Sequence, residues 1–302
     1  MIIYNNSKVD KKFKKSVVAI GNFDGLHLGH QKVLNQAKKK ANNNNLKLGV
    51  ITFEPVPVMF FNKKLKNHRI SNLSQKVKNL KKLKVDFLYI IKFNKKFSNL
   101  NPEDFIKKII FKNLNCKFVF VSKNFKFGKN REGSVKKLIQ YEKKFSYKSI
   151  ITKALKQNKN VLSSTIIRKK IANGYMADAN NLLGRPWNVE GLIIKGKQRG
   201  RKIGFPTCNI KLNNYIVPKL GVYSVKVEVS KYKKRGIANI GYRPTFNGNN
   251  LLLEVNIFGL KANLYKKPIK VSFIKFIRAE KKFKDINQLK IQIKKDITKA
   301  KK

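Results

Sequence analysis

The segment GNFDGLHLGH at residues 21–30 holds the residue types best suited to chemistry on a phosphate. The chain has 3 histidines, and two of them, His27 and His30, stand in this segment. Imidazoles can donate hydrogen bonds to an oxyanion as negative charge develops on it. The glycines around them let a backbone turn approach a ligand closely. The segment therefore predicts a phosphate site and nucleotidyl transfer, a reaction that depends mainly on positioning and charge stabilisation.

Two other interpretations of this segment stay open. The H-x-x-H spacing also suits a metal ion, but no nearby cysteine or third histidine completes a ligand set. The second interpretation is a glycine-rich turn with two incidental histidines. The surrounding sequence favours the phosphate site, because residues 16–23 predict a strand that delivers the chain to the turn. A helix predicted to begin near His30 would point its free N–H groups back at that turn.

A second segment with phosphate-binding residue types is SSTIIR at residues 163–168. Serine and threonine hydroxyls at a helix start can cap its free N–H groups. The guanidinium of Arg168 can hold phosphate oxygens at two points. An ordinary helix cap followed by a surface arginine would give the same pattern.

The segment GKQRGRKIGFPTCN at residues 196–209 predicts a flap over a nucleotide. Its glycines permit close approach, and its basic residues supply positive charge. Thr207 and Asn209 are two positions apart, so their side chains share one face of an extended chain. A hydroxyl and an amide oxygen side by side suit Mg²⁺, which would bridge to the phosphates of ATP.

Glu254 lies in the run LLLEVNIF as a lone acid amid apolar neighbours. Such surroundings favour a carboxyl group that takes up a proton, as a general base does. The alternative is a glutamate in an ion pair with one of the many lysines.

The first part of the chain alternates strand-like and helix-like patterns up to about residue 180. Strands are predicted at residues 16–23, 48–53, 85–93 and 117–122, and helices at 31–42, at 74–83 and after Asn101. This alternation predicts a parallel α/β sheet.

The second part changes to short β-like runs separated by turns. The runs at 191–195, 221–229, 237–240, 251–258 and 269–276 predict an antiparallel sheet or barrel. Asp285 and the spacing of Ile293 and Ile297 then predict a capped final helix. The boundary between the two parts is expected at about residue 183.

The composition limits the class of protein. The formal charge is +55, which would attract nucleic acid without sequence preference. The lysines are spread along the whole chain, however, and no zinc-finger or RNA-sheet signature accompanies them, so compositional drift is favoured over a basic polyanion-binding protein. The 2 cysteines form no disulfide framework and predict a reducing, cytoplasmic compartment. No apolar run reaches the roughly 18 residues that span a bilayer.

The segment at 21–30 resembles the nucleotide-binding loop of the nucleotidylyltransferase superfamily. In its G-x-F-D-G-x-H-x-G-H form it is similar to the FMN adenylyltransferase module of bacterial bifunctional riboflavin kinase/FAD synthetases, as are ITFEPVP, FKFGKNREG and SSTIIR. The resemblance implies a Rossmann-like domain over residues 1–183 that transfers AMP from ATP to FMN. It implies catalytic roles for His27, His30 and Arg168. It implies ATP contacts from Gly21, Phe23, Asp24, Gly25, His27, His30, Ser163, Ser164, Thr165 and Arg168, and flavin contacts from Asn124 and Phe127.

The second part resembles the riboflavin kinase domain through LGRP, RGRKIGFPTCNI, IANIGYRPTF, LEVNIF and FIRAEKKF. The resemblance implies an antiparallel barrel with a C-terminal helix over residues 184–302, which phosphorylates riboflavin with Mg-ATP. It implies that Glu254 takes the proton from the ribityl hydroxyl. It implies ATP contacts from Gly196, Arg199, Gly200, Gly204, Thr207 and Asn209, magnesium contacts from Thr207 and Asn209, and flavin contacts from Arg278 and Glu280.

One departure from the family pattern bears on activity. Ser122 and Lys123 stand where the family usually has glycine followed by an acid, which adds bulk and reverses charge near the flavin loop. The expected function is conversion of riboflavin to FMN and of FMN to FAD, with ATP, riboflavin and FMN as substrates. A riboflavin kinase with an impaired adenylyltransferase module is the first alternative.

Overall fold

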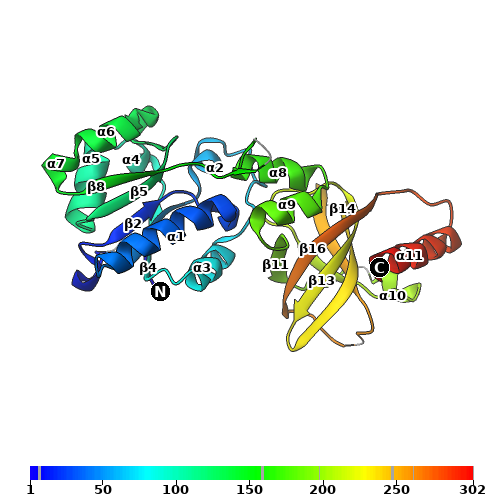
Figure 1. The fold of residues 1–302 in the computed structure, drawn as a ribbon. Helices are drawn as coiled ribbons and strands as arrows, with labels where there is room; N and C mark the ends of the chain where they lie inside the picture. Colours follow the sequence, from blue (N-terminus) through cyan, green and yellow to red (C-terminus); the bar gives the residue numbers. More distant parts are fainter. Residues whose placement is uncertain (6–7, 158–159, 197, 246–247, 261, 302) are drawn as a thin grey trace. The chain divides into compact units, whose positions relative to one another are not determined.

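The computed structural model describes residues 1–5, 8–157, 160–196, 198–245, 248–260 and 262–301. The chain forms two compact units (Figure 1). The first consists of Met1–Leu65 and Leu73–Ser163, and the second of Lys66–Asn72 and Ser164–Lys302. Among the helices in these described ranges, none combines the length and the apolar character that crossing a membrane requires.

The first unit is built on a six-stranded sheet in the order β1-β4-β3-β2-β5-β8, with every pairing parallel. The strands are β1 (Ile2–Asn5), β2 (Val17–Ile20), β3 (Leu48–Glu54), β4 (Phe87–Lys92), β5 (Phe118–Ser122) and β8 (Lys148–Thr152). The four residues of β2 are all buried, as expected for a strand covered on both faces. The predicted parallel α/β sheet is confirmed, and β1 and β8 are strands that the sequence patterns did not indicate.

Helices cover both faces of this sheet (Figure 1). Alternate residues of β2 point to opposite faces, so Val17 and Ala19 pack in the core with α1 (Leu28–Asn43) and α3 (Leu73–Lys82). On the other face, Val18 and Ile20 pack in the core with the π-helical segment η3 (Ile106–Asn113), α6 (Val135–Gln140) and α7 (Glu142–Phe145).

Short elements complete the first unit. They are η1 (Lys11–Phe13), η2 (Asp24–Leu26), α2 (Pro57–Phe61), α4 (Lys95–Ser98), α5 (Pro102–Phe105), β6 (Lys126–Phe127), η4 (Lys129–Arg131), β7 (Gly133–Ser134), β9 (Lys156–Gln157) and β10 (Asn160–Val161). The helix start predicted at Asn101 is confirmed, because its side-chain oxygen accepts a hydrogen bond from Asp104 N at 2.7 Å and Pro102 follows it.

The second unit is a six-stranded antiparallel barrel in the order β11-β16-β13-β14-β15-β12. The strands are β11 (Asn188–Leu192), β12 (Cys208–Lys211), β13 (Gly221–Val229), β14 (Tyr232–Thr245), β15 (Gly248–Ile257) and β16 (Pro268–Ala279). The barrel is nearly closed, because an antiparallel bridge joins Ile194, just beyond β11, to Asn209 on β12. The antiparallel barrel predicted for this part of the chain is confirmed.

In the described part of the second unit, the helices beside the barrel are α8 (Ser164–Ala172), α9 (Met176–Leu183), α10 (Arg199–Lys202) and α11 (Ile286–Lys301). The cap predicted at Asp285 is confirmed, since its Oδ1 accepts from Gln288 N at 2.9 Å. Behind that cap, α11 packs its Ile293 and Ile297 against Val222 and Ile237 of the barrel. Packing assigns α8 and α9 to the second unit, whereas the functional boundary at residue 183 stays a prediction.

Candidate active sites

The segment at residues 21–30 leaves the carboxyl end of β2 at the point where the strand order reverses. β2 pairs with β3 on one side and with β5 on the other, and ligands of open α/β sheets bind outside the strands at such a switch point. The turn is tight, with φ of 47° at Phe23, 74° at Gly25 and 41° at Leu26. Left-handed backbone at Phe23 and Leu26 is uncommon for such residues and persists only where the surroundings enforce it.

His27 and His30 lie against each other at the start of α1. Their rings stack with centroids 3.7 Å apart and an interplanar angle of 20°. The helix begins at Leu28 rather than near His30, because His27 is the N-cap and its Nδ1 accepts from His30 N at 3.3 Å. An accepting Nδ1 carries no proton, so the N–H of a neutral His27 ring is at Nε2.

Gly29 and Phe23 hold this histidine pair in place. A Cβ at Gly29 would lie 3.1 Å from the His27 ring, so a larger residue would push the ring away. The Phe23 ring lies 5.2 Å from the His30 ring, and its side chain is 3% exposed within the core. Asp24 is also buried, with only 3% of its surface exposed. The side chain of Phe23 therefore serves packing, and any contact of this residue with ATP would come from its backbone.

The predicted flavin residues lie beyond β5 in the same unit. Asn124 is exposed, as are Ser122 and Lys123, so both residues of the departure from the family pattern lie in solvent. Phe127 on β6 is buried and stacks on Phe125 with centroids 5.4 Å apart and an angle of 20°.

A band of phenylalanines continues from Phe127 along the carboxyl edge of the sheet, and the sequence reasoning missed it. Successive rings lie 5.2–6.1 Å apart along Phe127, Phe105, Phe97 and Phe93, which also contacts the rings of Phe53, Phe60 and Phe61. Phe61 on α2 is 69% exposed, so the band ends at the surface. The feature of the sequence that indicates this band is a group of phenylalanines at or just after the ends of β3 and β4.

Most of the SSTIIR residues belong to the second unit, and the two histidines belong to the first. Ser164, Thr165 and Arg168 stand on α8, which begins at Ser164, and Ser163 is the last residue of the first unit. The Nε of Arg168 donates to the carbonyl of His68 at 2.8 Å, within the second unit. Neither unit by itself contains both the histidine pair and this arginine.

The second unit brings one predicted metal ligand, Asn209, beside the predicted base. Asn209 on β12 pairs directly with Glu254 on β15, so the two side chains emerge side by side on one face. Their neighbours on β15, Leu253 and Val255, are fully buried on the opposite face, inside the barrel. The Asn209–Glu254 pair thus lies on the outer face of the barrel wall.

Two glycines of the flap, Gly196 and Gly200, lie near the two predicted metal ligands. A Cβ at Gly196 would come within 2.2 Å of the Asn209 amide, and a Cβ at Gly200 on α10 would lie 3.4 Å from Thr207 Oγ1. Only glycine allows the flap to rest this close to Asn209. Gly204 has a φ of 88° and open space around it, so there a positive φ, and not close packing, favours glycine. Arg199 is the first residue of α10.

The row of paired residues continues across the barrel to Arg278. Glu254 pairs with Asn239 on β14, Asn239 with Val222 on β13, and Val222 with Arg278 on β16. The sequence reasoning missed Asn239. Its Nδ2 donates to Glu280 Oε1 at 3.4 Å.

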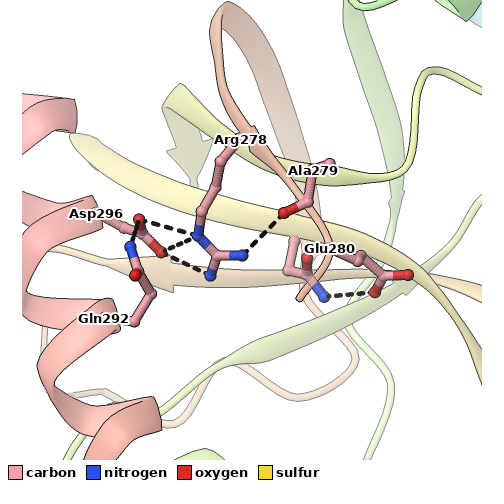
Figure 2. Close-up of polar contacts among 6 residues, drawn as sticks. Arg278, Ala279, Glu280, Gln292 and Asp296 are labelled. Carbon is pink, nitrogen blue, oxygen red and sulfur yellow. Dashed lines mark hydrogen bonds and ion pairs between the residues drawn. The ribbon is translucent and has the colours of Figure 1, made fainter. Parts of the chain in front are cut away.

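Arg278 is engaged with the C-terminal helix (Figure 2). Its Nε lies 3.1 and 2.9 Å from the two carboxylate oxygens of Asp296, and its NH2 group lies 2.8 Å from Oδ2. Its NH1 group donates to the carbonyl of Ala279 at 2.9 Å, and Gln292 donates to Asp296 Oδ1 at 2.9 Å. Arg278 therefore connects the end of β16 to α11, and Glu280, just beyond the strand, is exposed.

The two sites differ in whether their side chains suit a magnesium ion. Thr207 and Asn209 offer neutral oxygen atoms of the kind that Mg²⁺ accepts. Within the described ranges, no three His, Cys, Asp or Glu side chains lie close enough together to hold a metal ion. His27 and His30 therefore belong to no such group there.

The fold and these two sites define a class of protein: a nucleotide-dependent transferase that joins a Rossmann-like unit to an antiparallel barrel. A family model described as FAD synthetase matches residues 9–166, and one described as riboflavin kinase matches residues 183–302. The chain belongs to the family of bifunctional riboflavin kinase/FMN adenylyltransferases.

Similar proteins support this assignment over the full length. A bifunctional riboflavin kinase/FMN adenylyltransferase of Buchnera aphidicola is 41% identical, over 99% of this chain and 96% of the relative. One from Bacillus subtilis is 40% identical, over 98% and 94%. A crystal structure described as a macrolide-efflux protein from Streptococcus pneumoniae superposes with a TM-score of 0.88 at 31% identity, covering 100% of this chain and 99% of that one.

Proposed function

We propose that the chain catalyses two successive reactions with ATP. The barrel phosphorylates riboflavin to FMN, and the α/β unit transfers AMP to FMN, giving FAD and pyrophosphate. Membership of the family supports both activities, since both family models match and relatives about 40% identical carry both names. The functional modules are proposed as residues 1–183 and 184–302. The free thiols of Cys116 and Cys208 support a reducing, cytoplasmic compartment.

The direct pairing of Asn209 with Glu254 is the observation that carries the kinase proposal. Glu254 takes the proton from the terminal hydroxyl of the ribityl chain as that oxygen attacks the γ-phosphorus of ATP. The bond from the γ-phosphorus to the bridging oxygen breaks, and ADP leaves. A base beside the nucleotide site meets the geometric requirement for general base catalysis.

A magnesium ion suits the Thr207 and Asn209 pair. The hydroxyl and amide oxygens are neutral donors two positions apart, with Asn209 on β12 and Thr207 just before it, and glycine at position 196 lets the flap lie against the Asn209 amide. The ion, when bound, neutralises charge on the phosphates of ATP. Gly196, Arg199, Gly200 and Gly204 are proposed to cover that nucleotide, with Arg278 and Glu280 near the flavin.

Adenylyl transfer is assigned to the histidine segment. A phosphate oxygen of FMN attacks the α-phosphorus of ATP, and pyrophosphate leaves. The Nε2–H of His27 and the ring of His30 stabilise negative charge on the phosphate oxygens as it develops. Backbone around Gly21, Phe23, Asp24 and Gly25 surrounds the nucleotide, and Ser163, Ser164, Thr165 and Arg168 keep the phosphate-binding role that the resemblance implies.

The phenylalanine band is partly buried and reaches the surface at Phe61, where it offers an apolar surface for the flavin of FMN. The isoalloxazine ring is flat and aromatic, and aromatic side chains stack on such rings. Phe127 and Asn124, at one end of this band, are the proposed flavin contacts. The aromatic chain up to the exposed Phe61 extends that surface.

A product assay tests the proposed function. Purified protein is incubated with riboflavin, ATP and Mg²⁺, and the flavins are separated by chromatography. We expect FMN to appear first and FAD to follow. FMN without FAD would show riboflavin kinase activity alone and would refute the adenylyl transfer. The absence of both flavin products would refute the whole proposal.

A further inference from the structure

Lys76 on α3 is a buried cation that neither reaction described above uses. Its side chain is 2% exposed and is among the largest fully buried side chains of the chain. Three other lysines of the same helix, Lys78, Lys81 and Lys82, are exposed, as expected on a lysine-rich surface. A lysine is rarely buried unless its charge is paired or hydrogen-bonded, so its position requires a reason.

The ammonium group of Lys76 reaches the histidine segment through one threonine. Its Nζ donates to Thr52 Oγ1 at 3.1 Å, and Thr52, on β3, is fully buried. Thr52 Oγ1 in turn donates to the carbonyl of Asn22 at 3.2 Å. A hydroxyl has a single proton, so a Thr52 that donates to Asn22 must accept from Lys76, and the direction of both hydrogen bonds is fixed.

Asn22 is the residue that precedes the strained part of the turn. Phe23 follows it with a φ of 47°, and Leu26 has a φ of 41°. Residues in this conformation persist only where neighbouring groups hold them. The same part of the turn is also tied to β3 by Gly21 N, which donates to the carbonyl of Ile51 at 3.1 Å.

Helix α3 also packs directly on the turn that it supports. It contacts η2, the turn Asp24–Leu26 that leads into the stacked histidines. Simple filling of this interior would need only an apolar side chain, because burying a charge is costly. The presence of lysine at this position therefore indicates that its donor capacity or its charge is needed under the phosphate-binding segment.

We propose that Lys76 is a positioning residue for adenylyl transfer. It acts through Thr52 on the carbonyl of Asn22 and so holds the turn that presents His27 and His30 to the phosphates of ATP. This inference rests on the proposed function of the α/β unit. The role is distinct from catalysis, because Lys76 acts through other residues.

The test compares Lys76→Met and Thr52→Val with Lys82→Met, a matched control on the exposed face of the same helix. Thr52→Val keeps the shape of the side chain and removes only the hydroxyl, so it remains informative if Lys76→Met folds poorly. We expect both variants to raise the KM for ATP in FMN adenylylation, by about tenfold or more for Lys76→Met, with the KM for FMN and the riboflavin kinase rate within twofold. The KM for ATP of the double variant should be no higher than that of Lys76→Met alone, because both changes break the same chain of hydrogen bonds.

Hydrogen exchange of the peptide covering residues 21–30 gives a readout that is independent of activity. Without ATP, these amides should exchange faster in both variants than in the wild type and in Lys82→Met. A uniform rise in exchange over the whole unit, or a wild-type KM for ATP in both variants, would overturn the proposal. A wild-type protein that makes no FAD from FMN would instead refute the proposed function, and the exchange result would still test the positioning of the turn.

Discussion

Glu254 lies between two amide side chains, Asn209 on one neighbouring strand and Asn239 on the other. This arrangement puts a single acid beside the pair of oxygen donors expected to hold Mg-ATP. The sequence reasoning left a general base and an ion-paired glutamate equally open. The base role stays a prediction, and the pairing with Asn209 places Glu254 beside a residue expected to hold Mg-ATP.

Replacing Glu254 with Gln removes the base and keeps the size of the side chain. We expect riboflavin phosphorylation to fall about 10²- to 10⁴-fold, the usual range for losing a general base, while FMN adenylylation continues. The measurement is the rate of each step with purified protein, supplied with riboflavin or with FMN.

Glu228→Gln is the matched control, because Glu228 is a half-exposed glutamate of the same barrel whose Oε1 lies 2.7 Å from Lys270 Nζ. It should leave both rates unchanged. Loss of both activities in a folded Glu254→Gln protein would contradict the division of labour, and an unchanged kinase rate would contradict the base role.

At the scale of elements, the contact between α11 and the barrel includes one buried carboxylate besides the apolar packing of Ile293 and Ile297. Asp296 is 1% exposed and accepts from both Arg278 and Gln292. Arg278 precedes the exposed Glu280, so the position of the proposed flavin segment depends on the docking of α11. The resemblance placed Arg278 near the flavin, and the structure adds that its guanidinium binds Asp296.

Asp296→Asn removes the charge that pairs with Arg278 and leaves the helix otherwise unchanged. We expect the free energy of unfolding of the second unit to fall by about 3 kcal/mol. This is near the lower end of the range for breaking a buried ion pair, because 22% of the Arg278 side chain is exposed. Urea unfolding followed by the fluorescence of Trp187 measures this, because it is the chain's single tryptophan and lies in the barrel core.

Asp285→Asn is the control on the same helix. Asparagine caps a helix about as well as aspartate, so its effect should be within a few tenths of a kcal/mol. Equal urea midpoints for Asp296→Asn and the wild type would show that the ion pair does not stabilise the docking of α11.

At the scale of the whole molecule, the charge of +55 is distributed over both units. Such a field binds nucleic acid through counterion release, without need of a recognition element. We therefore expect nucleic acid to bind through this charge without sequence preference, as a consequence of composition rather than as a second function.

Two DNA duplexes of unrelated sequence should bind the protein equally, with affinity that falls steeply between 50 and 200 mM salt. A chain that neutralises about six to ten phosphates loses roughly 10³- to 10⁵-fold in affinity over that range. Fluorescence anisotropy at several salt concentrations measures both quantities. A preference for one sequence that survives added salt would favour the polyanion-binding alternative.

Much of the fold was predictable from local patterns. Buried runs such as that of β2 and the caps at Asn101 and Asp285 depend on neighbouring residues, so the sequence alone indicated them. Strands with a weak or mixed pattern were missed, as at β1 and β8, because their place in the sheet comes from pairing with distant strands.

The sequence by itself determined which residue types stand together in each turn and strand: the histidine pair, the glycine flap, and Thr207 beside Asn209. These spacings are local, and covalent geometry fixes their faces. Only the tertiary structure decided that Glu254 stands opposite Asn209, that Lys76 is buried under Asn22, and that Arg278 binds Asp296. Strand register and burial depend on packing between segments far apart in the chain, and no local spacing encodes them.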